Sequence, residues 1–436
     1  MNNHVIEALR VSENKRRLEY ESGETFFYLA DTAWELFHRL NREEAFLYLE
    51  DRAQKGFTVI QAALLAERDG LRRSNAYGRS PMKIDENGCF DPLQPDLEGE
   101  YSYWAHVDAI VRKAAEWNLY LALFPAWKDK FIGTRGEGPH MFTPEKAAAY
   151  GEWLGRRYAE EKNIIWVMGG DAAFTSRQQL DALTAMAQGI RKGDGGIHLM
   201  TLHPAAGGAS SAIADGEDWL DFHMIHSGHD RRHFNYRMIE NEWERYPYLP
   251  VLDAEADHEG RADNGEIAMG CMDDADARRS AYWAVLSGAC GHAYGHHSVA
   301  NFVRLPDKDT KKGYYVSSWR EALNAPGSGQ MKHLKALMEM VPFGEGEPAN
   351  GMVCGNMEGV NFVPVLKGRG WLIAYSAQGL SFDLSLNEGW AGASGCWFNP
   401  RTGETGDIFP VEAGKVSAFC PPSSGRSGDW ALLIRK

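Results

Sequence analysis

Two carboxylates stand where an apolar run of the sequence gives way to polar residues. Asp171 ends the run IIWVMGGD, in which two glycines let the backbone approach a ligand closely. Glu255 follows the apolar start of LPVLDAEADHEG. Glycoside hydrolysis needs such a pair, because one carboxyl protonates the leaving oxygen while an ionised one attacks the anomeric carbon. The two residues are therefore candidates for the catalytic pair of a glycosidase.

Both residues also have structural interpretations. Asp171 could cap the helix that follows it, as aspartate often does. Glu255 could belong to a buried ion pair. Asp253 lies two residues before Glu255, so strand alternation points both to the same side, and we interpret Asp253 as a supporting residue.

Further polar and aromatic residues lie at the ends of apolar runs. In a barrel of parallel strands the active site forms at the carboxyl ends of the strands. Flat rings can cover the C–H face of a sugar, and polar side chains can bind its hydroxyls. Each residue alone is equally compatible with core packing. The predicted substrate-binding residues are Asp31, Trp34, Gln61, Trp127, His203, His226, Tyr294 and His296.

The histidines allow a different mechanism, a metal-dependent barrel hydrolase. The residues that could assemble such a site are His203, His226, His229, His292, His296 and His297. However, the first predicted strand ends in ADTAW rather than in a His-x-His pair, and no H-E-x-x-H or C-x-x-C pattern occurs. We therefore expect no metal and no other cofactor.

Short apolar runs alternate with longer amphipathic segments between residue 26 and about residue 295. Eight runs are predicted strands: Phe26–Ala30, Thr58–Leu64, Tyr120–Phe124, Ile164–Met168, His198–Leu202, Phe222–Ile225, Val251–Ala254 and Ala289–Ala293. Predicted helices include Asn41–Lys55, Tyr103–Trp117, Thr143–Glu161 and Asp274–Ser287. No Gly-rich phosphate turn follows the first strand, which favours a closed (β/α)8 TIM barrel over a doubly wound sheet.

The sequence changes character after about residue 345. Short runs such as Val360–Leu366, Trp371–Tyr375 and Trp430–Ile434 are separated by Gly, Pro, Asn and Asp turns. This tail is predicted to be a small β-sandwich. The linker-like stretch Pro342–Asn350 divides the chain into a catalytic barrel over 1–344 and a C-terminal domain over 345–436.

The net charge and the hydropathy of the chain limit the classes of partner that we expect it to bind. The formal net charge of −14 at pH 7, without a cluster of Lys and Arg, disfavours nucleic acid and anionic membranes. No apolar run reaches the roughly 18 residues of a membrane span. The start MNNHVIEALR lacks the pattern of an export signal, so we expect a cytoplasmic protein with an oligosaccharide or glycoside as its partner.

Long segments of the chain resemble one known family, the apiosidase-like glycoside hydrolases, followed by a β domain named for collagen binding. The resemblance is carried by FFYLADTAWELFHRL, WVMGGD, PVLDAEADHEG and GHAYGHHSV, and by WFNPRTGE and FCPPSSGRSGDWALLI in the tail. It implies that Asp171 is the acid/base and that Glu255 is the nucleophile.

The resemblance also implies a retaining exo-glycosidase that removes a terminal pentose or related sugar, such as apiose, from a pectic oligosaccharide or glycoside. The chain departs from the more common GEPxYEG motif at Ala256 and His258, so we expect contacts with the sugar to differ there. Nothing in the tail indicates collagen binding, and we expect no collagen partner. The alternative from another class is a non-catalytic saccharide-binding barrel.

Overall fold

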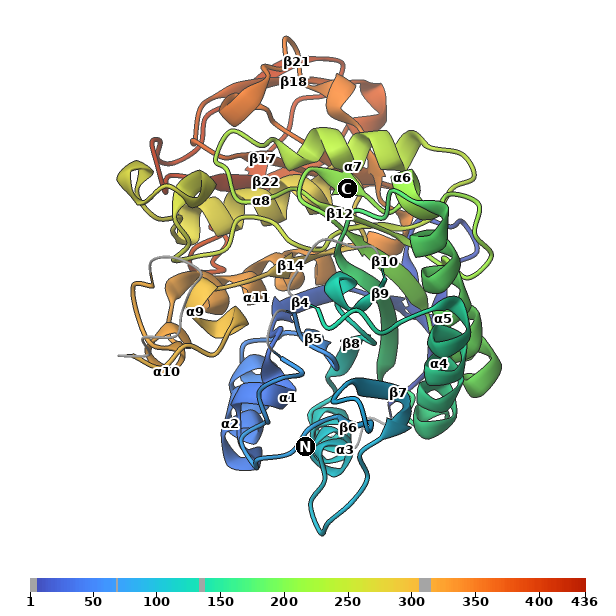
Figure 1. Cartoon of the computed structure of the whole chain (residues 1–436). Coiled ribbons are helices and arrows are strands. Elements are labelled where there is room, and N and C mark those ends of the chain that lie inside the picture. Colours follow the sequence, from blue (N-terminus) through green and yellow to red (C-terminus); the bar gives the residue numbers. More distant parts are fainter. Residues whose placement is uncertain (1–5, 68–69, 133–137, 306–314) are drawn as a thin grey trace.

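The computed structural model describes residues 6–67, 70–132, 138–305 and 315–436. Residues 1–5 belong to the start of the chain that was predicted to lack an export signal, and they lie outside the described residues. A curled sheet of nine strands forms the centre of the chain, in the order β10-β9-β8-β5-β4-β14-β13-β12-β11 (Figure 1). Its parallel strands are β4 (Tyr28–Thr32), β5 (Val59–Ala63), β8 (Tyr120–Phe124), β9 (Ile164–Ala172), β10 (Met200–Pro204), β12 (His223–His226), β13 (Val251–Asp253) and β14 (Gly291–Tyr294).

The sheet closes into a barrel between β10 and β12. The hydroxyl of Thr201 donates to the carbonyl of Phe222 (2.6 Å), and the backbone N–H of Asp221 donates to the carbonyl of Met200 (2.8 Å). The short β11 (Gly208–Ala209) pairs antiparallel with β12. The predicted TIM barrel is confirmed, and each of the eight predicted strands overlaps one of the parallel strands.

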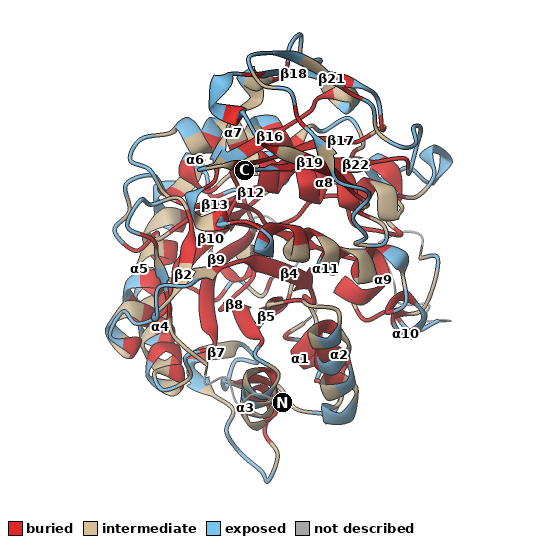
Figure 2. Ribbon diagram, turned by 180° about the vertical axis from the view of Figure 1, so that it is seen from behind, coloured by how far each residue is buried: buried red, intermediate tan, exposed pale blue. Residues whose placement is uncertain are grey.

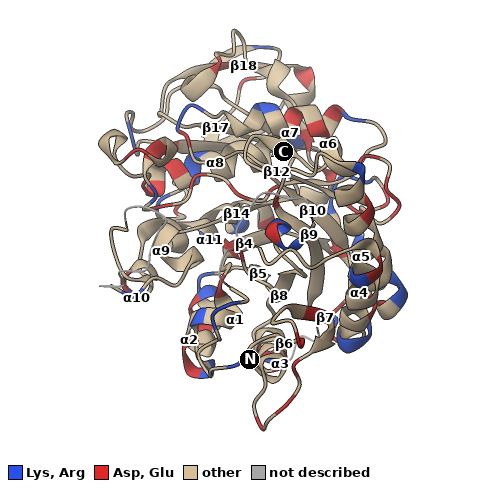
Figure 3. Cartoon of the chain, viewed as in Figure 1, with Lys and Arg blue, Asp and Glu red and all other residues tan. Residues whose placement is uncertain are grey.

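Helices cover the outside of the barrel. The longer ones are α2 (Arg42–Gln54), α3 (Tyr103–Glu116), α4 (Pro144–Tyr158), α5 (Arg177–Asp194), α7 (Asn235–Glu244), α8 (Asp274–Leu286) and α11 (Pro326–Glu339). Short helices are α1 (Leu36–Arg39), α6 (Ser211–Ala214), α9 (His297–Ala300) and α10 (Trp319–Ala322). The N-cap at Thr143 and the proline after it start α4, as predicted. Charged residues gather on outer helices such as α2, α4 and α5 (Figure 3).

A small sheet packs onto the amino-terminal end of the barrel. Its strands are β1 (Leu9–Val11), β2 (Leu18–Tyr20) and β3 (Thr25–Phe26). Leu9, Leu18 and Phe26 join the core that fills the barrel interior. The first barrel strand was predicted to begin at Phe26, but it begins at Tyr28, because Phe26 pairs within this small sheet instead. A hairpin of β6 (Met82–Ile84) and β7 (Phe90–Pro95) follows β5 and was not predicted.

The C-terminal domain is a β-sandwich. One sheet has the order β15 (Glu347–Pro348), β16 (Val365–Gly368), β17 (Trp371–Ser376), β22 (Trp430–Arg435), β19 (Ser394–Phe398) and β20 (Phe409–Pro410). The other pairs β18 (Phe382–Leu386) with β21 (Lys415–Phe419). The apolar residues of both sheets form one core. Strands β17 and β22 of the larger sheet are buried along most of their length (Figure 2). The predicted run Val360–Leu366 is a strand only from Val365, because a 3-10 turn over Gly359–Asn361 precedes it.

The free face of the larger sheet packs against α8 of the barrel. The rings of Tyr282 and Tyr375 stack with centroids 4.7 Å apart. Beside them the buried Arg278 pairs with Asp429 of the C-terminal domain through Nε and Nη2, at 3.0 and 2.9 Å. This interface fixes the sandwich to the back of the barrel. None of the helices in the described ranges has the length and apolarity that crossing a membrane requires.

Candidate active site

A cavity of about 500 Å³ opens at the carboxyl ends of the barrel strands. This is the end at which TIM barrels build their active sites. Its lining residues are Trp34, Glu67, Trp127, Lys128, Asp171, Ala205, Ala206, His226, His229, Glu255, His258, Arg261, His297, Ala300 and Asn301. Both predicted catalytic carboxylates are among them.

A bulge at the end of β9 presents Asp171 to the cavity. His203 of β10 pairs with Gly169, but Pro204 pairs with Ala172, so Gly170 and Asp171 are extra residues in β9. The φ angles of Gly169, Gly170 and Asp171 are all positive, at 86°, 103° and 47°. A Cβ on Gly170 would lie 2.6 Å from the Trp127 ring. Only glycine fits there, and the bulge that it permits turns the Asp171 side chain, 38% exposed, into the cavity.

The helix-capping alternative for Asp171 is not what the structure shows. The next helix, α5, begins at Arg177, and its N-cap is Ser176. The Ser176 hydroxyl accepts from the backbone N–H of Gln179, and the Gln179 side chain bonds back to Ser176. Asp171 is therefore available for chemistry.

Glu255 lies two residues after β13, across the barrel mouth from Asp171, and is 5% exposed. Its Oε1 accepts a hydrogen bond from His229 Nε2 (3.0 Å), and its Oε2 lies 3.4 Å from His203 Nε2. Burial disfavours its charged form, but the charges of His226, His258, His203 and Arg261 outweigh burial and lower the pKa of Glu255 to about 2. Glu255 is therefore ionised at neutral pH.

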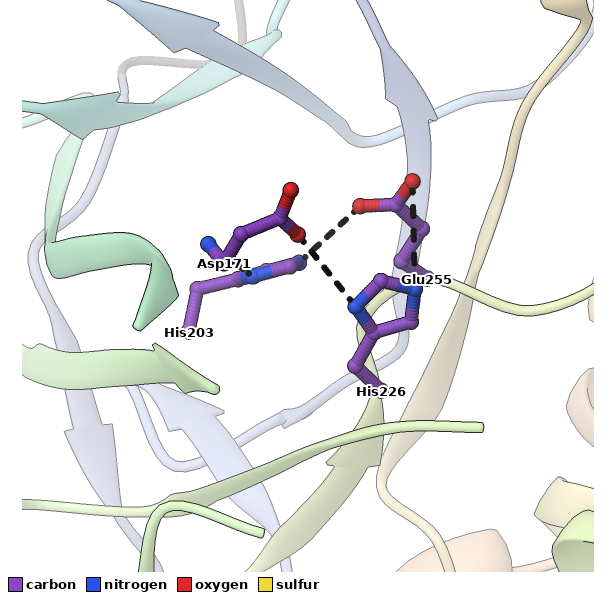
Figure 4. A group of neighbouring side chains, drawn as sticks. All are labelled: Asp171, His203, His226 and Glu255. Carbon is purple, nitrogen blue, oxygen red and sulfur yellow. Dashed lines mark hydrogen bonds and ion pairs between the residues drawn. The ribbon is translucent and has the colours of Figure 1, made fainter. Parts of the chain in front are cut away.

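His226 lies between the two carboxylates (Figure 4). Its Nδ1 is 3.5 Å from Asp171 Oδ1, and its Nε2 is 3.9 Å from Glu255 Oε1. Burial opposes the charge of His226, but Glu255 and Asp171 prevail and raise its pKa. Burial and the Glu255 charge work to raise the pKa of Asp171, yet the close contact with His226 and the charge of this imidazole prevail and lower it. The imidazole thus holds a proton beside both acids.

His203 packs beneath the carboxylates, fully buried. The backbone N–H of Asp171 donates to His203 Nδ1 (3.4 Å), so this imidazole helps to hold the bulge in place. Burial lowers the pKa of His203 to about 4. One donor atom each from Asp171, His203, His226 and Glu255 lies within 4.8 Å of the others. The structure therefore gathers four of the predicted residues into one group.

Trp34 and Trp127 form an aromatic wall of the cavity, as predicted for a sugar site. Their ring centroids are 5.1 Å apart at a steep angle, and Trp34 also packs edge-on against His203. Both are almost fully buried, so their orientation is set by packing rather than by a ligand.

Asp31 and Gln61, predicted to bind substrate, lie outside the cavity lining. Asp31 is fully buried and accepts hydrogen bonds from Tyr48 Oη (2.6 Å) and Arg52 Nε (2.7 Å) of α2. Gln61 is equally buried and donates through Nε2 to the carbonyl of Ala254 (2.9 Å). Both side chains tie barrel elements together, which corrects their predicted placement at the sugar.

Tyr294 and His296 are likewise placed away from the cavity lining. The Tyr294 hydroxyl donates to Glu259 Oε2 (2.7 Å), and His296 Nδ1 accepts from the backbone N–H of Ser298 as the N-cap of α9. Asp253 is fully buried under the site and accepts from Ser227 Oγ (2.9 Å) and Asn235 Nδ2 (2.8 Å). Its placement agrees with a supporting role beneath Glu255.

Several polar residues of the cavity do not directly follow an apolar run and were not predicted. Lys128 directly follows Trp127, and its ammonium donates to the backbone carbonyl of Asp171. Arg261 lies beyond Glu255 in the same segment, together with His258. Asn301 comes from the end of α9. Lys128 and Arg261 lie close in sequence to the predicted residues Trp127 and Glu255, and this closeness could have identified them as candidates.

Comparison with known proteins agrees with this fold. Residues 12–345 match the family model described as "Apiosidase-like, catalytic domain", and residues 348–435 match "Putative collagen-binding domain of a collagenase". A structure named "Glycoside hydrolase" is 32% identical with a TM-score of 0.88, over 99% of this chain and 97% of that one. A family 5 glycoside hydrolase from Bacteroides vulgatus is 30% identical with a TM-score of 0.87, over 98% and 93%.

No curated protein matches the chain. The barrel, the paired carboxylates and these similarities define a glycoside hydrolase. Within that class, the chain belongs to the apiosidase-like family.

Proposed function

We propose that the protein is a retaining exo-glycosidase in which Asp171 is the acid/base and Glu255 the nucleophile. The observation that carries the proposal is the spacing of the pair. A carboxylate oxygen of Asp171 and one of Glu255 lie within 4.8 Å of each other. Retaining enzymes hold their carboxyl groups about 5–5.5 Å apart, whereas inverting enzymes need roughly 6.5–9.5 Å to admit a water molecule. The spacing supports retention.

The electrostatics of Glu255 suit a nucleophile. The surrounding imidazoles and Arg261 keep its pKa at about 2, so it is ready to attack without first losing a proton. The hydrogen bond from His229 to Oε1 orients the carboxylate.

The proton for the leaving oxygen comes from the Asp171–His226 pair. His226 has a raised pKa and lies against Asp171, so the pair holds one proton near neutral pH. The negative charge of Glu255 raises the pKa of Asp171. When Glu255 becomes an ester, that charge is gone and the pKa of Asp171 falls further. Asp171 therefore suits an acid in the first step and a base in the second.

The reaction then runs in two steps. Glu255 attacks the anomeric carbon as the glycosidic bond breaks, and the proton shared by His226 and Asp171 passes through Asp171 to the departing oxygen. Asp171 next takes a proton from water, whose oxygen attacks the glycosyl ester and frees Glu255. Two inversions at the same carbon give a product sugar with the starting configuration.

The substrate is inferred from the cavity and the family. A volume of about 500 Å³ falls within the range of roughly 300–1,000 Å³ that is typical of small-molecule sites. The aromatic wall of Trp34 and Trp127 offers flat faces to a sugar ring. Together with the apiosidase-like family model, this supports a terminal pentose, such as apiose, on a pectic oligosaccharide or glycoside.

A screen of aryl pentosides and pectic oligosaccharides tests this proposal, with the first-formed anomer read by NMR. We expect release of a terminal pentose with the configuration of the substrate. Release of internal fragments would contradict exo action. Binding without turnover across the panel would favour the saccharide-binding barrel instead. In a Glu255→Gly variant, azide should restore turnover by forming a glycosyl azide of inverted configuration.

A further inference from the structure

The carboxylates and imidazoles of the site have buried polar atoms whose contacts with one another are long. His203, His226 and Glu255 are 0%, 3% and 5% exposed. His203 Nε2 lies 3.4 Å from Glu255 Oε2, and His226 Nδ1 lies 3.5 Å from Asp171 Oδ1, and neither contact is a hydrogen bond. Such long ion pairs offset the free-energy cost of burial only in part. The arrangement therefore favours a ligand that enters the cavity and contacts them together.

The spacing of these atoms matches the donor shell of a small cation. A tetrahedral zinc ion with bonds of about 2.0–2.2 Å to nitrogen and oxygen holds its donors roughly 3.4 Å apart. His203 Nε2 and Glu255 Oε2 are 3.4 Å apart, and His226 Nδ1 and Asp171 Oδ1 are 3.5 Å apart. All four residues converge on one point of the cavity (Figure 4). Small side-chain rotations would bring the two pairs around one ion.

We propose that Asp171, His203, His226 and Glu255 bind a divalent cation of the zinc class, which shuts off the enzyme reversibly. The ion would occupy both carboxylates of the proposed pair and so exclude the sugar. The inhibitory half of this inference rests on the proposed function. The binding half rests on the donor set alone.

The donor set selects the kind of ion. Two imidazoles and two carboxylates suit zinc, copper or cobalt, whereas magnesium and calcium prefer shells of oxygen alone.

A second group, His229 and His258 with Glu255, shares one ligand with the first. We favour the first group because His229 Nε2 already donates to Glu255 Oε1 (3.0 Å) and so carries its proton there. Binding a metal through that nitrogen would break an existing hydrogen bond. His203 Nε2 and His226 Nδ1 of the first group instead form only longer contacts, at 3.4 and 3.5 Å, with carboxylates that would bind the same ion.

Titration of the metal-free full chain with Zn²⁺ by calorimetry tests the binding half, with Co²⁺ absorption as a second readout. We expect one Zn²⁺ per chain, a Co²⁺ spectrum typical of four-coordination, and no binding of Mg²⁺ at equal concentration. The His203→Gln and Glu255→Gln variants should each weaken Zn²⁺ binding about tenfold or more. His333→Gln, a change in α11 far from the cluster in the fold, should leave it unchanged.

Three results would overturn the assigned ligands: no Zn²⁺ binding, equal binding by the His203→Gln variant with its far-UV circular dichroism intact, or loss of binding only in His258→Gln. Inhibition is measured on the aryl glycoside that the screen identifies. We expect Zn²⁺ to compete with substrate and EDTA to restore full turnover. Turnover that rises with Zn²⁺ would overturn the inhibitory role. A chain that binds Zn²⁺ but hydrolyses no glycoside would contradict the proposed function and leave the metal site standing.

Discussion

The barrel mouth and the interface between α8 and the C-terminal sandwich both bury charged groups, but they differ in how completely those groups are hydrogen-bonded. At the interface the guanidinium of Arg278 is fully used: Asp429 accepts from Nε and Nη2, and Gln330 accepts from Nη1 (2.6 Å). At the mouth, Glu255 Oε2 and the ring nitrogens of His226 have no hydrogen-bond partner among the described residues.

The difference distinguishes buried charges that fix the structure from buried charges that can take part in chemistry. Breaking a fully paired ion pair leaves one uncompensated charge in a region of low dielectric, so such a pair fixes geometry. Groups with long or incomplete contacts can instead bind what enters. The fully paired Arg278 lies behind the barrel, whereas the less completely paired His226 and Glu255 line the cavity at its mouth.

The largest effect should follow from changing Glu255. Glu255→Gln keeps the shape of the side chain and removes the nucleophile, so kcat/KM on an aryl glycoside should fall about 10⁴-fold or more. Unchanged turnover would show that the carboxylate at the mouth is structural, and the comparison would fail.

The opposite pattern is expected at the interface. Arg278→Met leaves Asp429 buried with a weaker set of partners, and should lower the free energy of unfolding by about 3–5 kcal/mol in urea titrations. The kcat of the folded fraction should stay within twofold of the parent. Lys335→Met, which breaks the exposed pair with Glu339, is the matched control and should change stability by less than about 0.5 kcal/mol. A loss of kcat in a stable Arg278→Met protein would contradict the division of roles.

Gly170→Ala tests whether the β9 bulge aims Asp171. Its Cβ would meet the Trp127 ring at 2.6 Å, in a backbone conformation with φ of 103°. A displacement of the acid by about 1 Å should lower kcat around 10²-fold. Gly195→Ala, which also has positive φ but has open space around its Cβ, controls for backbone strain and should keep kcat. Equal kcat in both variants would show that the bulge does not matter for catalysis.

The smallest predicted effect concerns Glu259, whose carboxyl has hydrogen-bond partners although burial still disfavours its charged form. Burial raises the pKa of Glu259 from 4.5 to about 7, although hydrogen bonds from Tyr294 and Gly327 oppose the rise. Between these two pH values the folded chain keeps a proton that the unfolded chain has released, so this residue makes stability fall as pH rises.

Glu259→Gln should therefore reduce the fall in unfolding free energy between about pH 4.5 and 7, by on the order of 1 kcal/mol. Urea titrations at several pH values measure it. Asp257, whose pKa burial also raises to about 7, remains in the variant and keeps part of the slope. A steeper fall in the variant would contradict the sign.

The fold followed from the sequence because alternating apolar runs and amphipathic segments are local signals. The strand ends also located Asp171, Glu255, Trp34, Trp127 and His226 at the cavity. They failed for Asp31 because its partner, Arg52, approaches from the far end of α2, a tertiary contact that no strand pattern shows. The bulge was also hidden, since two glycines before an aspartate do not reveal that two residues leave the ladder.

The most direct test of the account is to trap the intermediate on Glu255. In an Asp171→Ala variant, an aryl glycoside with a good leaving group needs no acid for the first step, whereas the second step lacks its base. We predict that the glycosyl-enzyme accumulates, and that peptide mapping by mass spectrometry finds one sugar residue on Glu255. Sugar on a different residue, or rapid turnover without a covalent species, would contradict the pairing of Asp171 and Glu255.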